Sequence, residues 1–379
     1  MKIRTDLARF SPFRAFKTIL YNLVQCDTIE SVSTSRASGL FFIESDRETR
    51  SWARLRKCVH GNDLMTEYAY AKVNLGLLVL GRRDNGYHDL DMVMETISIH
   101  DELIIERSAA PGIRLTCRLE GGLADKGYEL SSGDDNLIVR AGNALLQYAS
   151  GHGITDPEAL TSDGEPGYDI TLIKRIPMAA GLAGGSTDAA AALRGISSML
   201  KRSDGTGVTE EILCEIGAKI GADIPYCIMG GSRRASGIGE VLKPLPTPSE
   251  SYLVILKPDI DVSTGHIYKM TDENTDYASS DRQAAYDRFE ALILALNDGD
   301  IQGVSHNLHN DLRYAAINEH PVIRELEDKM NGYGALGAMM SGSGPSVFAI
   351  FDDEDVRDNA LRHIREDYPE IYASDAEFV

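Results

Sequence analysis

The sequence predicts an α+β fold in which antiparallel strands are covered by helices on one face. Short apolar segments have the alternating pattern of strands, and longer segments between them have the 3.6-residue period of helices. A segment with three prolines, residues 244–249, divides these elements into two groups and is typical of a linker. A chain of 379 residues is long enough for two domains, which we expect at 65–245 and 246–379.

The first group of elements begins with a strand at 70–80. This segment alternates and leads into a turn, because Asn85-Gly86 readily adopts the positive φ that a tight turn needs. A helix at 137–148 has apolar residues at helical spacing and is preceded by Asn136, a good capping residue. Further strands are expected at 97–99, 102–106, 113–119 and 169–174, and further helices at 187–200 and 210–220.

The second group begins with a strand at 252–256 and ends with a pair of strands and a helix. The turn Ser341-Gly342-Ser343-Gly344-Pro345 joins the two strands, and its glycines suit a tight hairpin as well as a ligand contact. The strands are expected at 335–340 and 346–351, and the helices of this group at 281–296, 301–308, 321–330 and 354–366.

The first 64 residues differ from the rest of the chain in charge and patterning. They carry 11 Lys and Arg against 7 Asp and Glu, a net +4, which leaves −24 for residues 65–379. No helical or strand period continues across them, and seven acids are unusual in an organelle-targeting peptide. We hypothesise that residues 1–64 are an atypical extension outside the native protein and that Met65 is the natural start.

The most informative segment is a run of small residues that leads into a strong helix-forming sequence. Bare backbone amides at a helix N-terminus bind anions, and each charge contributes about 0.3–1 kcal/mol when exposed. Such a loop lets a chain of net charge −20 hold a triphosphate without many lysines. The loop has neither the Gly-Lys-Ser/Thr of a P-loop nor the Gly-x-Gly-x-x-Gly of a dinucleotide site, and the alternative is a tight turn without a ligand. Its residues are Pro177, Met178, Ala179, Ala180, Gly181, Leu182, Ala183, Gly184, Gly185, Ser186 and Thr187.

Four further motifs accompany this loop. They are Ala71-Lys72-Val73-Asn74-Leu75, Gly81-Arg82-Arg83-Asp84-Asn85-Gly86-Tyr87-His88, Asn136-Leu137-Ile138-Val139-Arg140-Ala141 and Gly221-Ala222-Asp223-Ile224-Pro225. Together with the loop they resemble the GHMP kinases, from about residue 66 to the C-terminus. The resemblance implies a two-domain fold, with an N-terminal ATP-binding βα domain and a C-terminal ferredoxin-like α/β sandwich. It also implies an enzyme that binds ATP at residues 177–187, uses Mg²⁺, and phosphorylates the 2-hydroxyl of a cytidine-diphosphate-linked isoprenoid precursor.

Phosphoryl transfer to an alcohol needs a group that accepts the hydroxyl proton. Asp223 stands between apolar neighbours, where a carboxylate needs a cationic partner, and Lys72 stands in an otherwise apolar strand. The resemblance makes these residues the catalytic pair, and the alternative is a structural ion pair or two separate surface charges. Asn74 shares a strand face with Lys72 and is expected to bind substrate. Ser186 or Thr187 is the expected Mg²⁺ contact.

Aromatic residues suggest how the base of the acceptor is held, because a base stacked on an aromatic ring gains on the order of 1–3 kcal/mol. The resemblance places Tyr87 and Tyr268 around cytosine and His88 at its polar edge. Taken alone, such residues are more often surface or core residues. Two rival functions stay open: a GHMP kinase or decarboxylase for a mevalonate-type acid, and a non-catalytic binding protein of the same fold.

Composition limits the partners and the compartment. The net charge of −20 argues against nucleic acid or an anionic membrane as a partner. The five cysteines include no Cys-x-x-Cys pair, so we expect neither a zinc site nor a disulfide framework, and the reducing cytoplasm is favoured. We expect a monomer or homodimer that acts on a small molecule. The sequence gives no role to Arg233 and Arg234.

Overall fold

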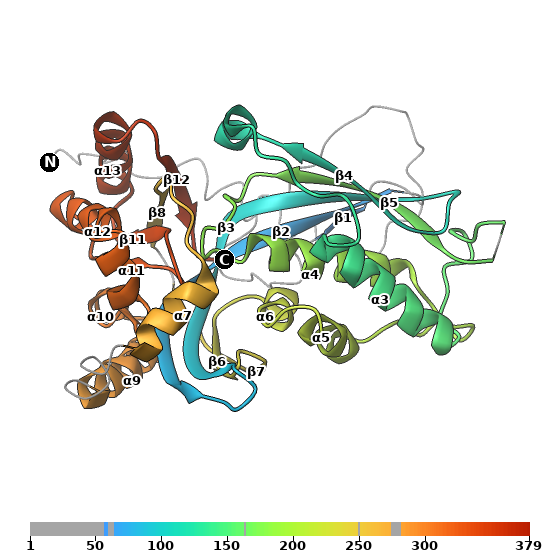
Figure 1. Ribbon diagram of the computed structural model, residues 1–379, viewed down its shortest axis with the longest axis horizontal. Coiled ribbons are helices and arrows are strands. Elements are labelled where there is room, and N and C mark those ends of the chain that lie inside the picture. The colour runs from blue at the N-terminus through green and yellow to red at the C-terminus, as the bar shows by residue number, and fades with distance from the viewer. Residues whose placement is uncertain (1–56, 60–63, 163, 249–250, 274–281) are drawn as a thin grey trace, which may run out of the picture. The chain divides into compact units, whose positions relative to one another are not determined.

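Two β-sheets contain the strands of the residues that the computed structural model describes, which are 57–59, 64–162, 164–248, 251–273 and 282–379 (Figure 1). The larger sheet has the strand order β1-β2-β3-β5-β4, with β6 beside β3, β7 beside β6 and β9 beside β2. Its strands are β1 (Lys57–Val59), β2 (Leu64–Arg82), β3 (His88–Arg107), β4 (Gly112–Leu119), β5 (Gly167–Lys174), β6 (Arg233–Gly237), β7 (Val241–Pro244) and β9 (His309–Asn310). The smaller sheet is antiparallel, in the order β10-β11-β8-β12, and consists of β8 (Tyr252–Lys257), β10 (Gly337–Met340), β11 (Val347–Phe351) and β12 (Tyr372–Glu377).

The long strands β2 and β3 form a hairpin in the larger sheet. Its turn is the predicted one: Gly86 has a φ of 87°, and its amide donates to the carbonyl oxygen of Arg83 at 3.0 Å. The predicted strand at 70–80 is confirmed and is longer at both ends. The prediction of two separate strands at 97–99 and 102–106 is wrong, because β3 continues through Asp101. This acid does not end the strand, since it is fully buried and accepts a hydrogen bond from Lys174.

Two pairs of strands, β4 with β5 and β2 with the short β9, depart from the antiparallel arrangement that the sequence predicts. β4 and β5 are parallel, with Gly112 opposite Gly167, and the predicted helix α3 (Leu137–Gly151) lies in the connection between them. A parallel pair requires a crossover of about a dozen or more residues, which this helix provides. Asn136 caps α3 as predicted, because its side-chain oxygen accepts from the amide of Ile138 at 2.9 Å.

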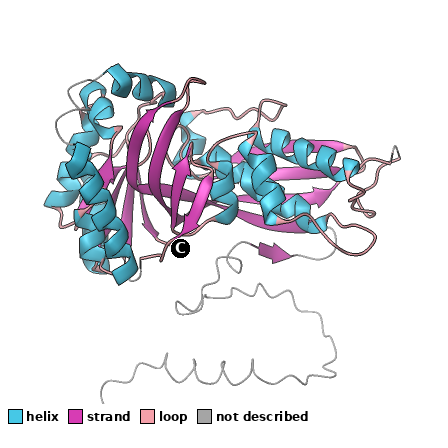
Figure 2. Ribbon diagram, turned by 90° about the horizontal axis from the view of Figure 1, so that it is seen from below, coloured by secondary structure: helices cyan, strands magenta, loops and turns pink. Residues whose placement is uncertain are grey.

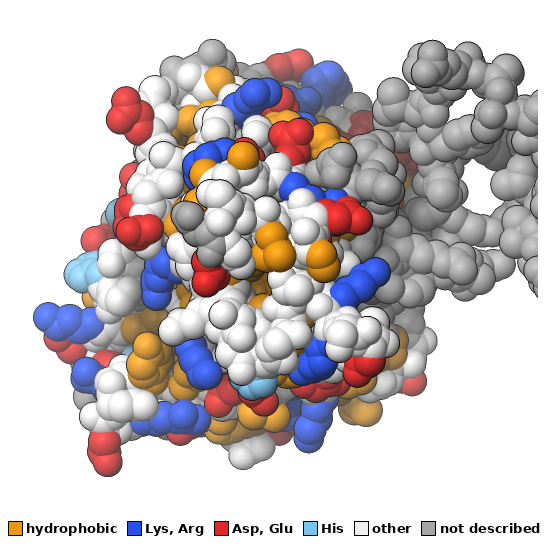
Figure 3. All heavy atoms as spheres, turned by 90° about the vertical axis from the view of Figure 1, so that its right-hand side faces the viewer, with side chains coloured by type: hydrophobic (Ala, Val, Ile, Leu, Met, Phe, Trp, Pro, Cys, Tyr) orange, Lys and Arg blue, Asp and Glu red, His pale blue; other side chains and the backbone are white. Residues whose placement is uncertain are grey.

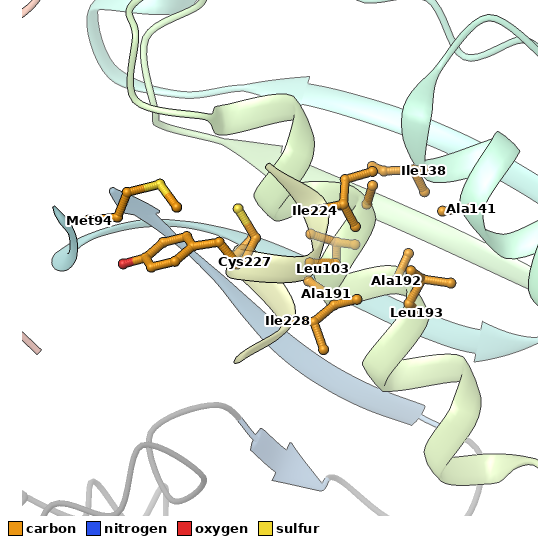
Figure 4. Packing of buried hydrophobic residues seen from close by; sticks show 14 of the residues in the cluster. Met94, Leu103, Ile138, Ala141, Ala191, Ala192, Leu193, Ile224, Cys227 and Ile228 are labelled. Atoms are coloured by element: carbon orange, nitrogen blue, oxygen red, sulfur yellow. The ribbon is translucent and has the colours of Figure 1, made fainter. Parts of the chain in front are cut away.

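Helices cover one face of the larger sheet, as Figures 1 and 2 show. They are α3, α4 (Gly184–Met199), α5 (Glu210–Ala218) and α6 (Ile224–Met229). α4 packs on β2 and β3, whereas α3 and α6 pack on α4. Figure 4 shows the core that results, where side chains of α4 and α6 such as Leu193 and Ile228 lie close to Leu103 of β3. Each large aliphatic side chain buried in this way contributes about 1.5–3 kcal/mol, so the core holds α4 and α6 in place on the sheet.

Helices also cover the smaller sheet. α12 packs on β10 and β11, and α13 packs on β8, β11 and β12. The predicted helices are confirmed at α9, α10, α12 and α13, with bounds that differ by a few residues, and residue 281 lies outside the described residues. The sequence does not predict α6, α7, α11 or β12. The helices of this part are α7 (Thr264–Glu273), α9 (Arg282–Asp298), α10 (Ile301–His306), α11 (Arg313–Glu319), α12 (Val322–Gly332) and α13 (Glu354–Asp367).

The domain boundaries after residues 64 and 245 stay predictions. Residues 1–56 and 60–63 lie outside the described part of the chain, whereas β1 pairs antiparallel with β2, Cys58 opposite Thr66. The second boundary falls between β7 and β8, in the predicted linker, whose last residue also lies outside the described part. β9 comes after this boundary in sequence and nevertheless pairs with β2, so the C-terminal part of the chain completes the larger sheet.

The surface mixes charges of both signs. On the side that Figure 3 shows, Lys and Arg side chains are interspersed with Asp and Glu, and hydrophobic side chains lie among them. None of the helices in the described ranges is long and apolar enough to cross a membrane.

Candidate active site

A cleft of about 1160 Å³ brings together residues from distant parts of the sequence. Its walls come from β2, β3, the glycine-rich loop before α4, the start of α6, α7 and the turn before β11. The predicted residues in the lining are Lys72, Asn74, Tyr87, His88, Pro177, Met178, Ala179, Ala180, Gly181, Ala183, Gly184, Gly185, Ser186, Asp223 and Tyr268. The structure therefore gathers the predicted nucleotide, catalytic and acceptor residues around one cavity.

The glycine-rich loop presents backbone to this cavity. Ala179, Gly181 and Ala183 have φ values of 48°, 72° and 59°, so the loop turns back on itself before α4 begins at Gly184. The first bond of the helix runs from the amide of Thr187 to the carbonyl oxygen of Ala183. The amides of residues 184–186 precede this bond and have no partner within the helix. They lie at the positive end of the helix dipole, which is a site for anions.

Two of the predicted loop residues point away from the cleft. Leu182 is buried in the hydrophobic core. The Thr187 hydroxyl is also buried and donates to the carbonyl oxygen of Tyr70 at 2.7 Å, so it fastens α4 to β2. Ser186 lines the cleft. Of the two hydroxyls predicted as a Mg²⁺ contact, that of Ser186 is therefore the one in position to face a ligand.

Lys72 lies at the floor of the cleft with only 5% of its surface exposed. Its ammonium donates to the side-chain oxygen of Asn74 at 2.6 Å and to the carbonyl oxygen of Gly181 at 3.2 Å. The first bond agrees with the prediction that Lys72 and Asn74 share a strand face. The second joins β2 to the glycine-rich loop, so the positive charge lies next to the loop that would hold phosphates.

Asp223 stands at the N-terminus of α6 and makes no capping hydrogen bond with its side chain. The carboxylate is therefore not occupied by its own helix. No ion pair joins Asp223 to Lys72 in the described residues. Both residues nevertheless line the cleft, and the charges of both influence the pKa of the Cys227 thiol. Burial raises the pKa of the Cys227 thiol, Asp223 raises it further and Lys72 lowers it. The catalytic pairing of Lys72 and Asp223 stays a prediction.

The acceptor end of the cleft contains an aromatic stack. The rings of His88 and Tyr268 are stacked, with centroids 4.8 Å apart and planes at 26°. Tyr87 also lines the cleft and is 57% exposed. Asp272 was not predicted from the sequence, and its carboxylate lies 2.8 Å from Nε2 of His88. Its spacing of four residues from Tyr268 is a usable signal only once α7 is known to be a helix.

A second buried lysine lies beneath the glycine-rich loop. Lys174 donates to Asp101 at 2.5 Å and to Asp188 at 2.7 Å, and all three side chains are buried. Burial alone would lower the pKa of Lys174, but the two carboxylates raise it, so the lysine stays charged. A Cβ at Gly184 would lie 2.9 Å from the lysine Nζ. This group therefore supports the start of α4 from below.

The turn before β11 braces the loop from the opposite side. The Ser341 hydroxyl donates to the carbonyl oxygen of Gly181 at 3.1 Å, and the Asn310 amide donates to that of Gly342 at 2.8 Å. Asn310 thus has a structural role. The two unexplained arginines are structural as well: Arg234 pairs with Asp91 and Glu290, and Arg233 donates to backbone carbonyls at the end of α6.

Comparisons with known proteins agree with this fold and site. The family model "GHMP kinases N terminal domain" matches residues 136–231, and "GHMP kinases C terminal" matches residues 291–370. The crystal structure of homoserine kinase from Cytophaga hutchinsonii shares the fold, with a TM-score of 0.62 and 18% identity over 85% of this chain and 99% of that one. Fold and site together define a kinase of the GHMP class, and the chain belongs to the GHMP kinase family.

Relatives place the chain within that family. The 4-diphosphocytidyl-2-C-methyl-D-erythritol kinase of Lachnoclostridium phytofermentans is 36% identical over 301 residues, which are 79% of this chain and 92% of that one. The kinase of the same name from Clostridium novyi is 36% identical over 304 residues, 80% and 97% of the two chains. A crystal structure of 4-(cytidine 5'-diphospho)-2C-methyl-D-erythritol kinase matches with a TM-score of 0.61 and 29% identity, over 82% of this chain and 99% of that one. The chain belongs to the 4-diphosphocytidyl-2-C-methyl-D-erythritol kinases.

Proposed function

We propose that this chain is an ATP-dependent kinase that phosphorylates the 2-hydroxyl of 4-diphosphocytidyl-2-C-methyl-D-erythritol, in the non-mevalonate route to isoprenoid precursors. The observation that carries the proposal is a single cleft with a helix N-terminus for phosphates, a lysine and an aspartate, and an aromatic stack. Relatives named for this activity match almost their whole length. A kinase for a mevalonate-type acid would need a basic group for the carboxylate and no aromatic stack. A binding protein would need neither Lys72 nor Asp223.

The glycine-rich loop is the proposed site for the phosphates of ATP. The amides of residues 184–186 lie at the positive end of the α4 dipole and line the cleft, where they can bind a triphosphate. Mg²⁺ prefers hard oxygen ligands, and the Ser186 hydroxyl fits this preference at the start of α4. Mg²⁺, when bound, would neutralise charge on the phosphates.

Asp223 is the proposed base. Its carboxylate accepts the proton of the acceptor hydroxyl while that oxygen forms a bond to the γ-phosphorus. The bond between the γ-phosphorus and the bridging oxygen breaks, and ADP leaves. Lys72 is held by Asn74 and the Gly181 carbonyl oxygen, so its charge is fixed beside the loop before substrate arrives. A preorganised charge of this kind stabilises negative charge that develops in the transition state.

The aromatic stack is the proposed site for the cytosine base. The ring of Tyr268 stacks on His88, and the part of its face that His88 leaves uncovered can stack on a base. The exposed Tyr87 can cover the other side of that base. Stacking on Tyr268 contributes on the order of 1–3 kcal/mol. Asn74 faces the reacting end of the cleft and is the proposed contact of the erythritol part.

We also propose that residues 65–245 and 246–379 are the two domains and that the enzyme works in the cytoplasm. The boundary between them falls between β7 and β8. Cys117, Cys214 and Cys227 are free thiols in the described residues, which suits a reducing compartment.

The test is turnover of the proposed substrate. The full chain is incubated with Mg-ATP and 4-diphosphocytidyl-2-C-methyl-D-erythritol, ADP release is followed by a coupled assay, and the product is identified by mass spectrometry. We expect one ADP for each molecule of phosphorylated product. ADP at the background rate, from protein that binds ATP in calorimetry, would reject the assignment.

A further inference from the structure

Two side chains of α7, those of Asp272 and Tyr268, contact the imidazole of His88. The Oδ1 atom of Asp272 lies 2.8 Å from Nε2 of His88, and its Oδ2 atom lies 3.8 Å from Arg82. Tyr268, one helical turn earlier, stacks on the same ring. The ring of His88 is thus held by a stack on one face and by a carboxylate at one nitrogen.

The carboxylate determines which nitrogen of a neutral His88 carries the proton. An ionised carboxylate can only accept a hydrogen bond, so Nε2 donates and Nδ1 is left as an acceptor. Nδ1 has no hydrogen-bond partner in the described residues and is not sealed off from solvent. The side chain lines the cleft with 9% of its surface exposed. Whether Nδ1 of His88 accepts or donates a hydrogen bond in the cleft therefore depends on Asp272.

We propose that Asp272 is a specificity-determining residue, which keeps Nδ1 of His88 an acceptor and thereby selects a base with an amine at its edge, cytosine, over uracil. The inference rests on the proposed function. The exocyclic amine of cytosine donates to Nδ1, whereas the carbonyl oxygen that uracil carries there places one lone pair against another. A base in the plane of the imidazole also lies nearly parallel to Tyr268, since the two rings are only 26° apart. Edge recognition and stacking are thus compatible.

The experiment compares two acceptors in the full chain. Values of kcat and KM are measured for the cytidine substrate and for its uridine counterpart, with wild type and Asp272→Ala. Loss of one good hydrogen bond, together with a mismatched contact in its place, weakens binding by about 10- to 100-fold. We expect KM for the cytidine substrate to rise by about 10-fold or more in the variant, with kcat nearly unchanged. The preference for cytidine over uridine falls by the same factor, and Asp272→Glu restores part of it.

A second readout reports the tautomer directly. Nitrogen-15 NMR of His88 should show Nε2–H in the wild type and a mixture of both tautomers in Asp272→Ala. Asp287→Asn is the control, because it removes the same charge from an exposed residue of α9 that does not line the cleft. This control should leave the base preference as it is.

The outcomes separate the inference from the proposed function. An active wild type whose base preference is unchanged in the folded Asp272→Ala variant would overturn the role of Asp272 alone, as would a wild-type His88 protonated at Nδ1. A wild type that binds ATP but does not turn over the cytidine substrate would overturn both.

Discussion

Asp223 offers the cleft a carboxylate that is neither a cap of α6 nor, among the described residues, a partner of Lys72. Asp223→Asn keeps the shape of the side chain and removes the base. We expect kcat to fall by at least about 100-fold, the usual contribution of a positioned base. The dissociation constant of ATP should change little, because the loop of residues 177–187 and not Asp223 is the proposed phosphate site. Steady-state kinetics and titration calorimetry measure the two quantities.

Asp287→Asn on the exposed face of α9 is the control for Asp223→Asn, since it removes one charge from a residue outside the cleft lining. Its kcat should equal that of the wild type. Equal kcat values for Asp223→Asn and wild type would remove Asp223 from the mechanism.

Glu95 is a fully buried acid with no ion pair in the described residues. Its Oε1 accepts from the amide of Thr96 and the hydroxyl of Thr247, whereas Oε2 has no hydrogen-bond partner within the described part of the chain. Burial raises the pKa of Glu95 well above its ordinary 4.5, and the hydrogen bonds from Thr96 and Thr247 offset this only in part. The folded protein therefore holds a proton that the unfolded chain releases above about pH 4.5.

This proton makes stability depend on pH in a defined direction. Above the pKa of the unfolded chain the folded state binds more protons, so the free energy of unfolding falls as pH rises, until the folded carboxyl ionises. The slope for one group is at most about 1.4 kcal/mol for each pH unit. Urea unfolding at several pH values from about 5 upward should show wild type losing stability relative to Glu95→Gln, which is neutral throughout. A constant difference between the two proteins would show that Glu95 is ionised in the fold.

At the scale of elements, the glycine-rich loop and the turn before β11 fit together only because Gly181 has no side chain. Its φ is 72°, and a Cβ there would lie 2.3 Å from the carbonyl oxygen of Ser341. We expect Gly181→Ala to cost about 1–3 kcal/mol of stability and to raise KM for ATP, because the loop that carries the amides is displaced. Urea unfolding and steady-state kinetics test both effects.

Gly151→Ala is the matched change at the end of α3. A Cβ at Gly151 meets no atom within 4 Å, and its φ is not positive. This variant should be as stable as the wild type or slightly more stable. If Gly181→Ala behaved in the same way, the two turns would not be in the close contact described.

The elements that were predictable from the sequence have a long, clear period or strong end signals. The helices α3 and α13 are of this kind, with a capping residue and an apolar face. By contrast, α6 has only six residues, too few for a period, and α7 has a single buried residue, Ile267, so no apolar stripe marks it. Short β12 contains Ser374 and Asp375 and does not alternate clearly.

The candidate site was predictable where a local motif carries it. The loop at 177–187, Lys72 and Asp223 stand in such motifs, and Lys72, Asp223 and all of the loop except Leu182 and Thr187 line the cleft. Asp272 could not be predicted, because its contact with His88 joins residues 184 positions apart and depends on the unpredicted α7. The contact of Lys72 with the carbonyl oxygen of Gly181 could not be predicted either, since a backbone carbonyl leaves no trace in a sequence pattern.

At the scale of the whole described structure, the C-terminal part of the chain completes the N-terminal part. β9 pairs with β2, and the Asn310 amide and the Ser341 hydroxyl fix the turn that supports Gly181. The two sheets also share a hydrophobic cluster, which contains Val73 of β2 and Phe348 of β11. Because these contacts cross the predicted domain boundary, neither part keeps its buried surface when the other unfolds.

We therefore expect the two predicted domains to unfold in one cooperative transition. Hydrogen exchange of amides in β5 and in β11 should give the same free energy of opening, and far-UV circular dichroism should give the same urea midpoint. A non-hydrolysable ATP analogue at 100 times its dissociation constant stabilises the state that binds it by about 2.7 kcal/mol. Although the analogue is expected to contact the loop before α4, the amides of β11 should be stabilised as much as those of β5. Stabilisation confined to β5 would mean that the shared cluster does not couple the two sheets.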